Sequence, residues 1–567
     1  MRGFRADYAV VAAWLALGIA PALAQSNGPI QLGPANPPLV APVNDPFRQP
    51  APQGIQAETL APVDASWVGT LGPADAALPR TMWAKTPRSF VVQTLPLLQP
   101  TSVTVLQDLG RRLLLSDAAA PQGDDDESGP NLPELRLNRL LALGRVDGVG
   151  LIDIVPHLNA SERFDRDVVE LRIAANDLAG ACAAVPQGIA RYHNDWWARA
   201  VVGCQALTGA YDEAALGLSA LRDQKTGRDP VFEALIDTIL GHRQKLDKLP
   251  DPSPMRMALL AAAKLPLPAD TLTSAGPSAL LVWAMNDKVP VVQRLAAAER
   301  AAVLGALPPA GLGLLYGAVD SRPEEQGALL KGGKLVDDPR NRAMLFNIAR
   351  TNAPGAIRVS TLAPLLADAR RRGAFVSMAR LVAPLVAEIQ PAPEYQSFAG
   401  DAARALLAAH DLDHAAGWIN QTNTPELRAM AVLIYGGAGG IDAVGLREVQ
   451  ASLTARDAAA APRQTDILAS LLSALGEPVK DVDLAPLVQS THQAILPNGA
   501  LWLDQEQAAT AGRVGETVLT TILIASVGDH LSAEASVVAR AVAGLKAIGL
   551  DADARALALE AALAAGI

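Results

Sequence analysis

The chain has 567 residues, of which 50% are hydrophobic and only 4% aromatic, and it carries a net charge of −10. An acidic chain without a basic block argues against the nucleic-acid-binding classes, which need a positive surface. The length and apolar content are sufficient for several core-sized units. Because the apolar residues are mainly aliphatic, with many Ala and Leu, both strong helix formers, composition alone predicts an all-α protein.

Residues 1–24 have the pattern of an export signal. Arg2 and Arg5 precede an apolar run that is too short to span a bilayer comfortably, and ALA at 22–24 supplies the small residues expected before a cleavage site. The run AVVAAWLALGIAPALA resembles a bacterial export signal. We therefore expect cleavage after Ala24 and a periplasmic location. The next residue is Gln rather than Cys, which argues against a lipoprotein.

Residues 25–86 are predicted to be a Pro-rich linker or disordered arm. Nine prolines fall between residues 29 and 62, and proline, which lacks an N–H and fixes φ, suits neither a helix nor a sheet core. Whether this arm is a tether or a leader that clears the translocon stays open. A second break, PQGDDDESGPNLP at 121–133, is expected to be a surface loop because its acidic run lacks the alternating ligands of a calcium loop.

Residues 87–567 alternate helical periods with short breakers, which predicts stacked helical hairpins, with sub-lobes at 87–250 and 251–567. Asp229 and Asp338 each place a capping carboxylate before a proline at the first helical position, and Thr424 is expected to do the same. The most apolar later run, 518–527, is too short for a membrane span. It is expected to be a buried helix.

One pattern recurs between the expected helices: a turn residue, an apolar residue two positions on and a small residue three further. It is clearest in GAYDEA at 209–214, where Gly209, Tyr211 and Ala214 take these places. Gly ends the first helix in a left-handed conformation, the apolar residue seats the turn, and Ala allows the second helix to approach closely. The other turn positions are Gly144, Asn176, Gly373, His410, Gly512 and Gly549.

The spacing of these turns is close to a helical-hairpin repeat. Gly144, Asn176 and Gly209 follow one another at nearly equal intervals, close to the period of about 34 that is typical of tetratricopeptide units. Trp197 with GAYDEA resembles the end of the first helix, the turn and the start of the second helix in that family. The family's closing proline is missing elsewhere, and residues 250–350 match poorly, so continuity of the repeats there stays open. The resemblance implies a right-handed, tetratricopeptide-like α-solenoid that holds a partner in a concave groove.

The two cysteines have a place in such an array. Cys182 falls in the second helix of one unit and Cys204 in the first helix of the next. Those helices are neighbours in a solenoid, so a disulfide is expected if the Cα atoms approach within about 7 Å. Export would place the pair in an oxidising compartment. Two buried free thiols are the alternative.

Motifs for catalysis and cofactor binding are weak. HDLDH at 410–414 holds two His and two Asp, but at a predicted turn its imidazoles do not share a helical face, so we interpret His410 and Asp413 as two helix ends. GALLKGGK at 327–334 and YGGAGG at 435–440 depart from the spacings of a phosphate loop and a dinucleotide turn. Trp196 and Trp197 are candidates for a carbohydrate platform, although neighbours on a helix point about 100° apart, and core packing is the simpler interpretation. We predict no catalytic residue, cofactor or metal.

These observations predict a periplasmic scaffold or adaptor without enzymatic activity. Its partner is expected to be a protein or peptide of the cell envelope, bound through the helical-repeat surface, in envelope assembly, secretion or motility. Two alternatives stay open. One is an enzyme on an α/α scaffold that acts on cell-wall glycans, and the other is a structural subunit of an envelope complex whose contact is the Pro-rich arm.

Overall fold

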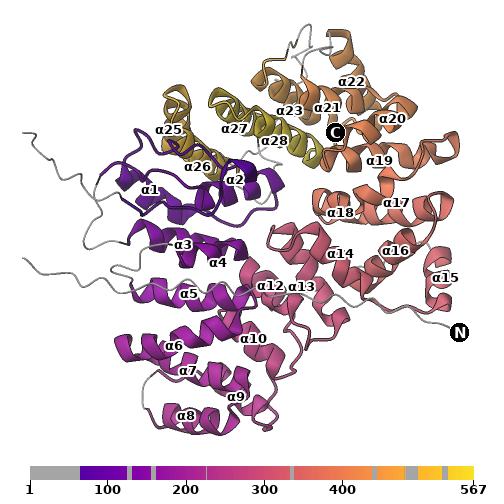
Figure 1. Cartoon of the computed structure of the whole chain (residues 1–567). Coiled ribbons are helices and arrows are strands. Elements are labelled where there is room, and N and C mark those ends of the chain that lie inside the picture. The colour runs from indigo at the N-terminus through magenta and orange to yellow at the C-terminus, as the bar shows by residue number, and fades with distance from the viewer. Residues whose placement is uncertain are drawn as a thin grey trace, which may run out of the picture. The chain divides into compact units, whose positions relative to one another are not determined.

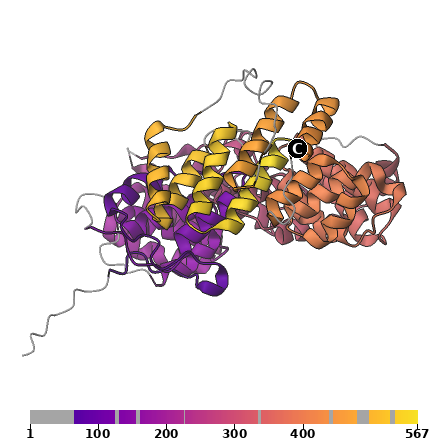
Figure 2. The same cartoon turned by 90° about the horizontal axis from the view of Figure 1, so that it is seen from above.

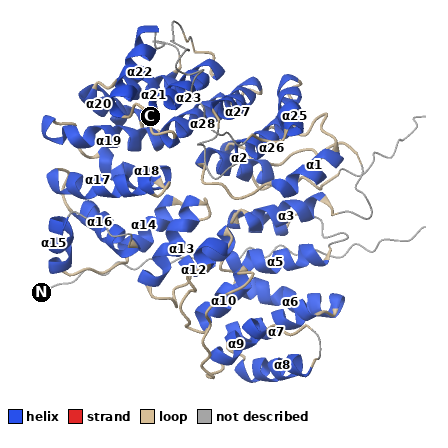
Figure 3. Cartoon of the chain, turned by 180° about the vertical axis from the view of Figure 1, so that it is seen from behind, coloured by secondary structure: helices blue, strands red, loops and turns tan. Residues whose placement is uncertain are grey.

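A computed structural model describes residues 64–123, 130–154, 161–224, 227–332, 338–436, 443–477, 479, 496–526 and 534–567. These segments are helical (Figure 1), and Figure 3 shows helices joined by loops. Within them, β-structure is limited to the isolated bridges Leu71–Ser116 and Pro87–Gln122. The predicted all-α class is confirmed, and helices that follow one another in sequence pack in pairs, as in a helical repeat array.

The helices and short 3-10 turns are given in chain order. The first part contains η1 Pro73–Asp75, α1 Arg88–Thr94, η2 Leu95–Leu97, α2 Thr104–Leu115, α3 Leu132–Ala142, η3 Val146–Gly148, α4 Val149–Ile152, α5 Glu162–Ala174, α6 Leu178–Tyr192, α7 Asp195–Thr208, α8 Tyr211–Asp223 and α9 Pro230–Ile239. The middle contains α10 Pro254–Ala262, α11 Thr271–Ser274, α12 Pro277–Met285, α13 Val291–Val303, α14 Pro309–Gly317, α15 Pro323–Gly332, α16 Pro339–Thr351, α17 Ala356–Arg371 and α18 Phe375–Ala387. The last part contains η4 Pro393–Tyr395, α19 Gln396–Ala408, α20 Leu412–Thr422, α21 Pro425–Tyr435, α22 Ala443–Arg456, α23 Ala461–Ala474, α25 Gly499–Thr510, α26 Val514–Ala525, α27 Ala535–Ala547 and α28 Asp551–Ala564.

Several predicted features lie wholly or partly outside the described residues. The expected signal peptide and the arm up to residue 63 lie outside them. The same holds for the acidic run at 124–127, for residues 333–334 of the GALLKGGK stretch and for residues 437–440 of the glycine run. No helix among the described segments is long and apolar enough to cross a membrane. The expected buried helix near 518–527 is represented by α26, which is buried from Gly515 to Ala525.

All seven predicted turn residues lie between two helical segments with a positive φ, from 59° at His410 to 88° at Gly209. At Gly373 the hydrogen bonds have the Schellman pattern: the Gly373 N–H donates to the Arg370 carbonyl, and the Ala374 N–H donates to the Ala369 carbonyl at 2.8 Å. A left-handed residue thus reverses the chain at each of these positions.

The side chains around the 209–214 turn differ in part from the expectation. Ala214 is fully buried, as expected, and α8 packs on α7, but Tyr211 is 53% exposed and does not seat the turn. Helical side chains lean toward the N-terminus of their helix and cover the preceding helical turn. Tyr211 is the first residue of α8, so it has no preceding turn of that helix to pack on. Trp197 lies at the start of α7 rather than at its end, and it is buried.

The predicted helix caps are formed at two of three positions. Asp229 Oδ1 accepts the Phe232 N–H at 3.0 Å, and Asp338 Oδ1 accepts the Arg340 N–H at 2.8 Å. Helix α21 begins at Pro425 as expected, but Thr424 makes no side-chain cap hydrogen bond. Proline at the first helical position is therefore the start signal that matters there.

Residues 64–86 belong to the folded body, which corrects the linker boundary placed at 86. Trp67 and Trp83 are fully buried and meet edge to face with ring centroids 4.8 Å apart. Arg136 donates to the Ser66 carbonyl at 3.0 Å and to the Leu114 carbonyl at 2.7 Å, with its guanidinium 4.6 Å from the Trp67 ring centroid. The dense run of prolines stops at residue 62, and the apolar residues beyond it supply core side chains.

The poorly matching middle is continuous with the rest, since α10 packs on α12, α12 on α13, α13 on α14 and α14 on α16. A buried ionic network joins three of these helices. Arg342 donates to both carboxylate oxygens of Glu299, at 2.8 and 2.6 Å, and the Tyr316 hydroxyl donates to the same carboxylate at 2.5 Å. Buried charges of this kind need full pairing, so the network fixes how α13, α14 and α16 sit together.

The last helices pack on the first ones, which a simple solenoid does not do. Repeat units normally contact only their neighbours, yet α2 packs against α26 and α28, and Figure 2 shows the yellow C-terminal helices beside the indigo N-terminal ones. The Gly515 N–H donates to the Met82 carbonyl at 2.8 Å, and the Thr104 N–H donates to Glu560 at 2.8 Å. Long-range contacts therefore add to the sequential pairs.

Candidate functional site

A cleft lies where α2, the turn after α3, the loop before α14, and α18 meet. It consists of a cavity of about 390 Å³ and an adjoining cavity of about 220 Å³, and Ser377 lines both. We call these two cavities the junction cleft. The larger one falls within the usual range for ligand sites, about 300–1,000 Å³. Its walls come from segments that are far apart in sequence, from Thr104 to Arg380.

Arg145 connects three walls of the junction cleft. It follows the turn residue Gly144 and donates to the Gly305 carbonyl and to the Gln107 carbonyl, both at 2.9 Å. Gln107 in turn donates to the Val303 carbonyl at 2.8 Å. Burial lowers the pKa of Arg145, but a guanidinium stays charged at neutral pH. Its hydrogen-bonded partners are main-chain carbonyls, so its charge contributes to the field of the cleft.

Glycine is required at position 144 by packing as well as by its backbone conformation. Its φ is +70°, and a Cβ there would lie 2.6 Å from Cβ of Ala306 and 2.8 Å from Cβ of Pro277. The turn after α3 therefore lies directly against the loop that precedes α14. This close approach holds Arg145 at the wall of the cleft.

Ion pairs form the polar border of the cleft. Asp108 lies 2.8 Å from Arg112, and Arg380 lies 3.2 Å from Glu560. Glu560 also accepts the N–H groups that begin α2, and burial raises its pKa to about 7 even though these hydrogen bonds and Arg380 favour the charged form. The Glu560 carboxylate thus connects α28 with α2 and α18 behind the cleft.

Apolar surface predominates in both cavities. Val103, Val303, Phe375 and Leu563 line the smaller one, together with the charged side chains of Arg370 and Glu560. Each cavity of the junction cleft thus combines apolar walls with a few polar groups, and the two cavities meet at the half-buried Ser377. Such a slot suits a ligand with main-chain-like polar groups and an apolar side chain.

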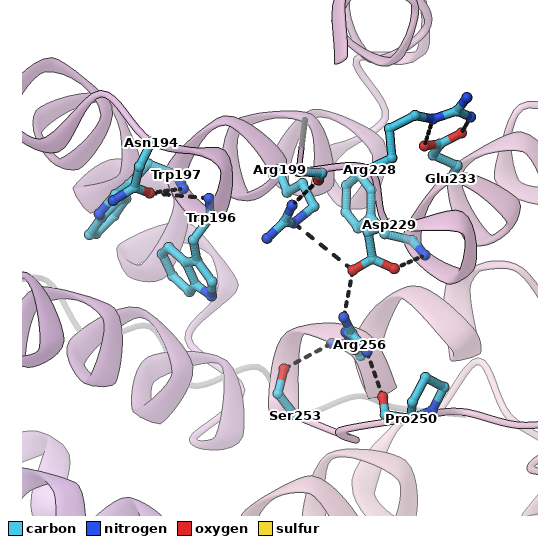
Figure 4. A network of polar contacts seen from close by, with 12 residues as sticks. Asn194, Trp196, Trp197, Arg199, Arg228, Asp229, Glu233, Pro250, Ser253 and Arg256 are labelled. Carbon is cyan, nitrogen blue, oxygen red and sulfur yellow. Dashed lines mark hydrogen bonds and ion pairs between the residues drawn. The ribbon is translucent and has the colours of Figure 1, made fainter. Parts of the chain in front are cut away.

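A separate cavity of about 230 Å³ lies among α5, α7, α9 and α10, and we call it the Trp196 cavity. Figure 4 shows the side chains of Trp196, Arg199, Asp229 and Arg256 around it. Asp229 Oδ2 lies 2.5 Å from Arg256 Nη2 and 4.0 Å from Arg199 Nε. The same carboxylate caps α9, so its position is set by the helix start.

Glu170 lines the Trp196 cavity from α5. It accepts the Ser253 hydroxyl at 2.9 Å and the Met255 N–H at 2.8 Å. Burial raises the pKa of Glu170 to about 7, and the two hydrogen bonds oppose this shift only in part. Glu170 therefore titrates near neutral pH at the wall of a cavity.

The two cysteines form a disulfide in the neighbouring hairpins. Cys182 in α6 and Cys204 in α7 have Cα atoms 5.5 Å apart and are bonded. The bond joins two successive hairpins, α5–α6 and α7–α8. A structural disulfide is typical of oxidising compartments.

The other candidates from the sequence are the HDLDH stretch at 410–414 and the tryptophan pair at 196–197. Asp411 accepts the His414 N–H at 3.3 Å and caps α20, while His410 is the left-handed residue that ends α19. Asp413 lies in the first turn of α20, as expected, and the side-chain cap of that helix comes from Asp411. Of the two tryptophans, Trp197 is buried against Tyr192, and Trp196 lines the cavity.

Comparison with protein-family models, with curated proteins and with solved structures finds no match to this chain. The site residues must therefore be judged on their own geometry. Sequence reasoning missed Arg145, Ser377 and Arg380, whose surroundings come from distant segments. The only available signal was the neighbouring turn residue Gly144. It also missed Arg199 and Arg256, although Asp229 beside them was found as a cap.

Proposed function

We propose that this protein is a non-enzymatic, right-handed, tetratricopeptide-like scaffold of the bacterial periplasm. It binds an extended peptide segment of a cell-envelope partner, and envelope assembly, secretion and motility are the processes it would serve. The junction cleft is the observation that carries this proposal. Its larger cavity offers Arg145 and Gln107, and its smaller cavity offers Phe375 and Leu563.

The chemistry of an extended peptide matches this mixture of apolar walls and polar groups. Its main-chain carbonyls and amides need hydrogen-bonding partners when they leave water, and its apolar side chains gain free energy in a dry pocket. Ser377, which lines both cavities, can both donate and accept a hydrogen bond. The hydrogen bonds of Arg145 to Gly305 and Gln107 hold the walls in place before a ligand arrives, which reduces the entropic cost of binding.

The compartment is supported by two independent features. Residues 1–24 resemble an export signal, and Cys182 and Cys204 form a disulfide, which persists in oxidising spaces. The acidic net charge of −10 favours a protein partner over nucleic acid.

Site-specific photo-crosslinking in intact cells tests the proposal. A photoreactive residue replaces Ser377 in the cleft, and in the matched control it replaces Ser219, which is exposed on α8. We expect one discrete adduct from position 377, whose crosslinked peptide is identified by mass spectrometry, and no such adduct from position 219. Equal adducts from both positions, or none from 377, would contradict a peptide-binding cleft.

A blocking variant provides the second readout. Ser377→Trp fills the space where the two cavities meet without removing an ion pair, and Ser219→Trp adds the same side chain elsewhere. The identified peptide, made synthetically, should bind wild type and Ser219→Trp with equal Kd and Ser377→Trp at least tenfold more weakly. Unchanged binding to Ser377→Trp would place the peptide outside the cleft.

A further inference from the structure

We propose that the Trp196 cavity is a second binding site and that it takes one neutral saccharide ring. This site is separate from the junction cleft and goes beyond the proposed peptide scaffold. Its residues come from four helices that are near one another in sequence, α5, α7, α9 and α10, and from the loops at their ends. The features that support a saccharide are an indole, a fixed pair of guanidinium groups and the balance of charge.

The indole of Trp196 is held in place and is accessible from the cavity. Its ring meets Trp197 edge to face with centroids 4.7 Å apart, and the guanidinium of Arg166 lies 5.1 Å from its centroid. Trp196 is only half-buried and lines the cavity. A rigid indole offers a large apolar surface together with one N–H donor. The C–H groups of a pyranose ring need such a surface.

Arg199 and Arg256 provide planar donors whose positions are fixed by the main chain. Arg199 donates to the Gly227 carbonyl at 2.8 Å, and Arg256 donates to the Pro250 carbonyl at 2.5 Å. Each guanidinium has five N–H groups, so donors remain for a ligand. Asp229 and Glu170 provide acceptors. Sugar hydroxyls donate and accept at once and therefore match this mixture.

The charge of the cavity favours a neutral ligand over an anion. Figure 4 shows Asp229 between Arg199 and Arg256, where an anionic ligand would need to sit. Asp251 and Glu170 add further carboxyl groups to the lining. An anion entering this space would be repelled at close range. The volume of about 230 Å³ is below the usual range for drug-sized ligands, which suits a single ring.

Saturation-transfer difference NMR on the full-length protein tests the site. The probes are four neutral sugars, glucose, galactose, mannose and N-acetylglucosamine, and two anions, glucuronate and citrate. We expect transfer to the ring C–H protons of at least one neutral sugar and none to the anions. In Trp196→Ala the same sugar should bind about tenfold more weakly, the factor that corresponds to loss of one stacking contact.

Trp502→Ala is the matched control. Trp502 is also half-buried and also has a guanidinium, that of Arg540, 4.8 Å from its ring centroid, and its loss should leave sugar binding unchanged. Trp196→Phe retains an aromatic ring and should retain most of the binding, which keeps the test valid if Trp196→Ala misfolds. Binding of anions alone, no transfer to any neutral sugar, or equal binding in wild type and both Trp196 variants would overturn the proposal.

Discussion

Reduction of the Cys182–Cys204 disulfide should loosen α6 and α7 and leave distant hairpins unchanged. The bond spans a sequence separation of 22 residues. In the loop-entropy model, closing a loop of this size stabilises the folded state by about 3 kcal/mol. A factor of ten in an equilibrium corresponds to about 1.4 kcal/mol, so the local opening of this pair should become roughly a hundredfold more frequent.

Hydrogen–deuterium exchange with mass spectrometry measures this opening segment by segment. Oxidised and reduced wild-type protein have the same side chains, so the comparison introduces no cavity. Peptides from α6 and α7 should lose about two orders of magnitude of protection. The hairpin α19–α20, which contains no cysteine and packs as a sequential pair, provides the internal control.

Two results would contradict a local effect of the disulfide. Unchanged protection in α6 and α7 would mean that the bond does not stabilise the two hairpins it joins. An equal loss of protection in α19–α20 would mean that the whole chain unfolds as one unit, which contradicts the nearest-neighbour behaviour of a repeat array.

Four further variants test individual contacts. Burial raises the pKa of Glu170 to about 7 from an ordinary 4.5, so the folded state keeps a proton that the unfolded state has already released. The free energy of unfolding of wild type should therefore fall by up to about 3 kcal/mol as the pH rises from 4.5 through 7. In Glu170→Gln, urea unfolding should show a weaker dependence of this free energy on pH. A Cβ at position 209 would meet open space, so Gly209→Ala should lower the free energy of unfolding by about 1–2 kcal/mol through backbone strain alone. Gly144→Ala adds a steric clash to this strain and should lower the Tm further. Arg136→Lys should expose residues 64–86 to trypsin, since it removes hydrogen bonds to two buried carbonyls.

The local parts of the fold could be predicted because local rules decide them. A residue that tolerates a positive φ, followed by a small residue five positions on, marked the turns at Asn176 and Gly209, since both requirements act within one hairpin. The pairing of Cys182 with Cys204 followed from the same hairpin order. Tyr211 shows the limit of such rules, because an apolar residue type does not by itself indicate burial.

Long-range packing could not be predicted in the same way. Composition placed 64–86 with the prolines before it, but the decisive contact is Arg136 with the Ser66 carbonyl, 70 residues away. The Thr104 contact with Glu560 spans 456 residues. No sequence period or motif indicates a contact between residues so far apart in the chain. The junction cleft depends on these contacts and was missed, whereas Asp229 at the Trp196 cavity was found through its capping position.

The junction cleft depends on contacts between segments that are far apart in sequence, whereas the Trp196 cavity is built from helices that are near one another. A single variant can therefore test the two proposed sites separately. Glu560 is buried, accepts the Thr104 N–H and pairs with the half-buried Arg380, so Glu560→Ala removes a shared acceptor of α2 and α18, at a cost of about 1–3 kcal/mol. The Trp196 cavity is built from α5, α7, α9 and α10, none of which contains Glu560 or packs closely on α28. Glu560→Ala should therefore abolish crosslinking at position 377, increase exchange in α2 and α28, and leave saturation transfer to the neutral sugar unchanged. Loss of sugar binding in this variant would show that the Trp196 cavity depends on the long-range contacts, and retained crosslinking would show that the cleft does not.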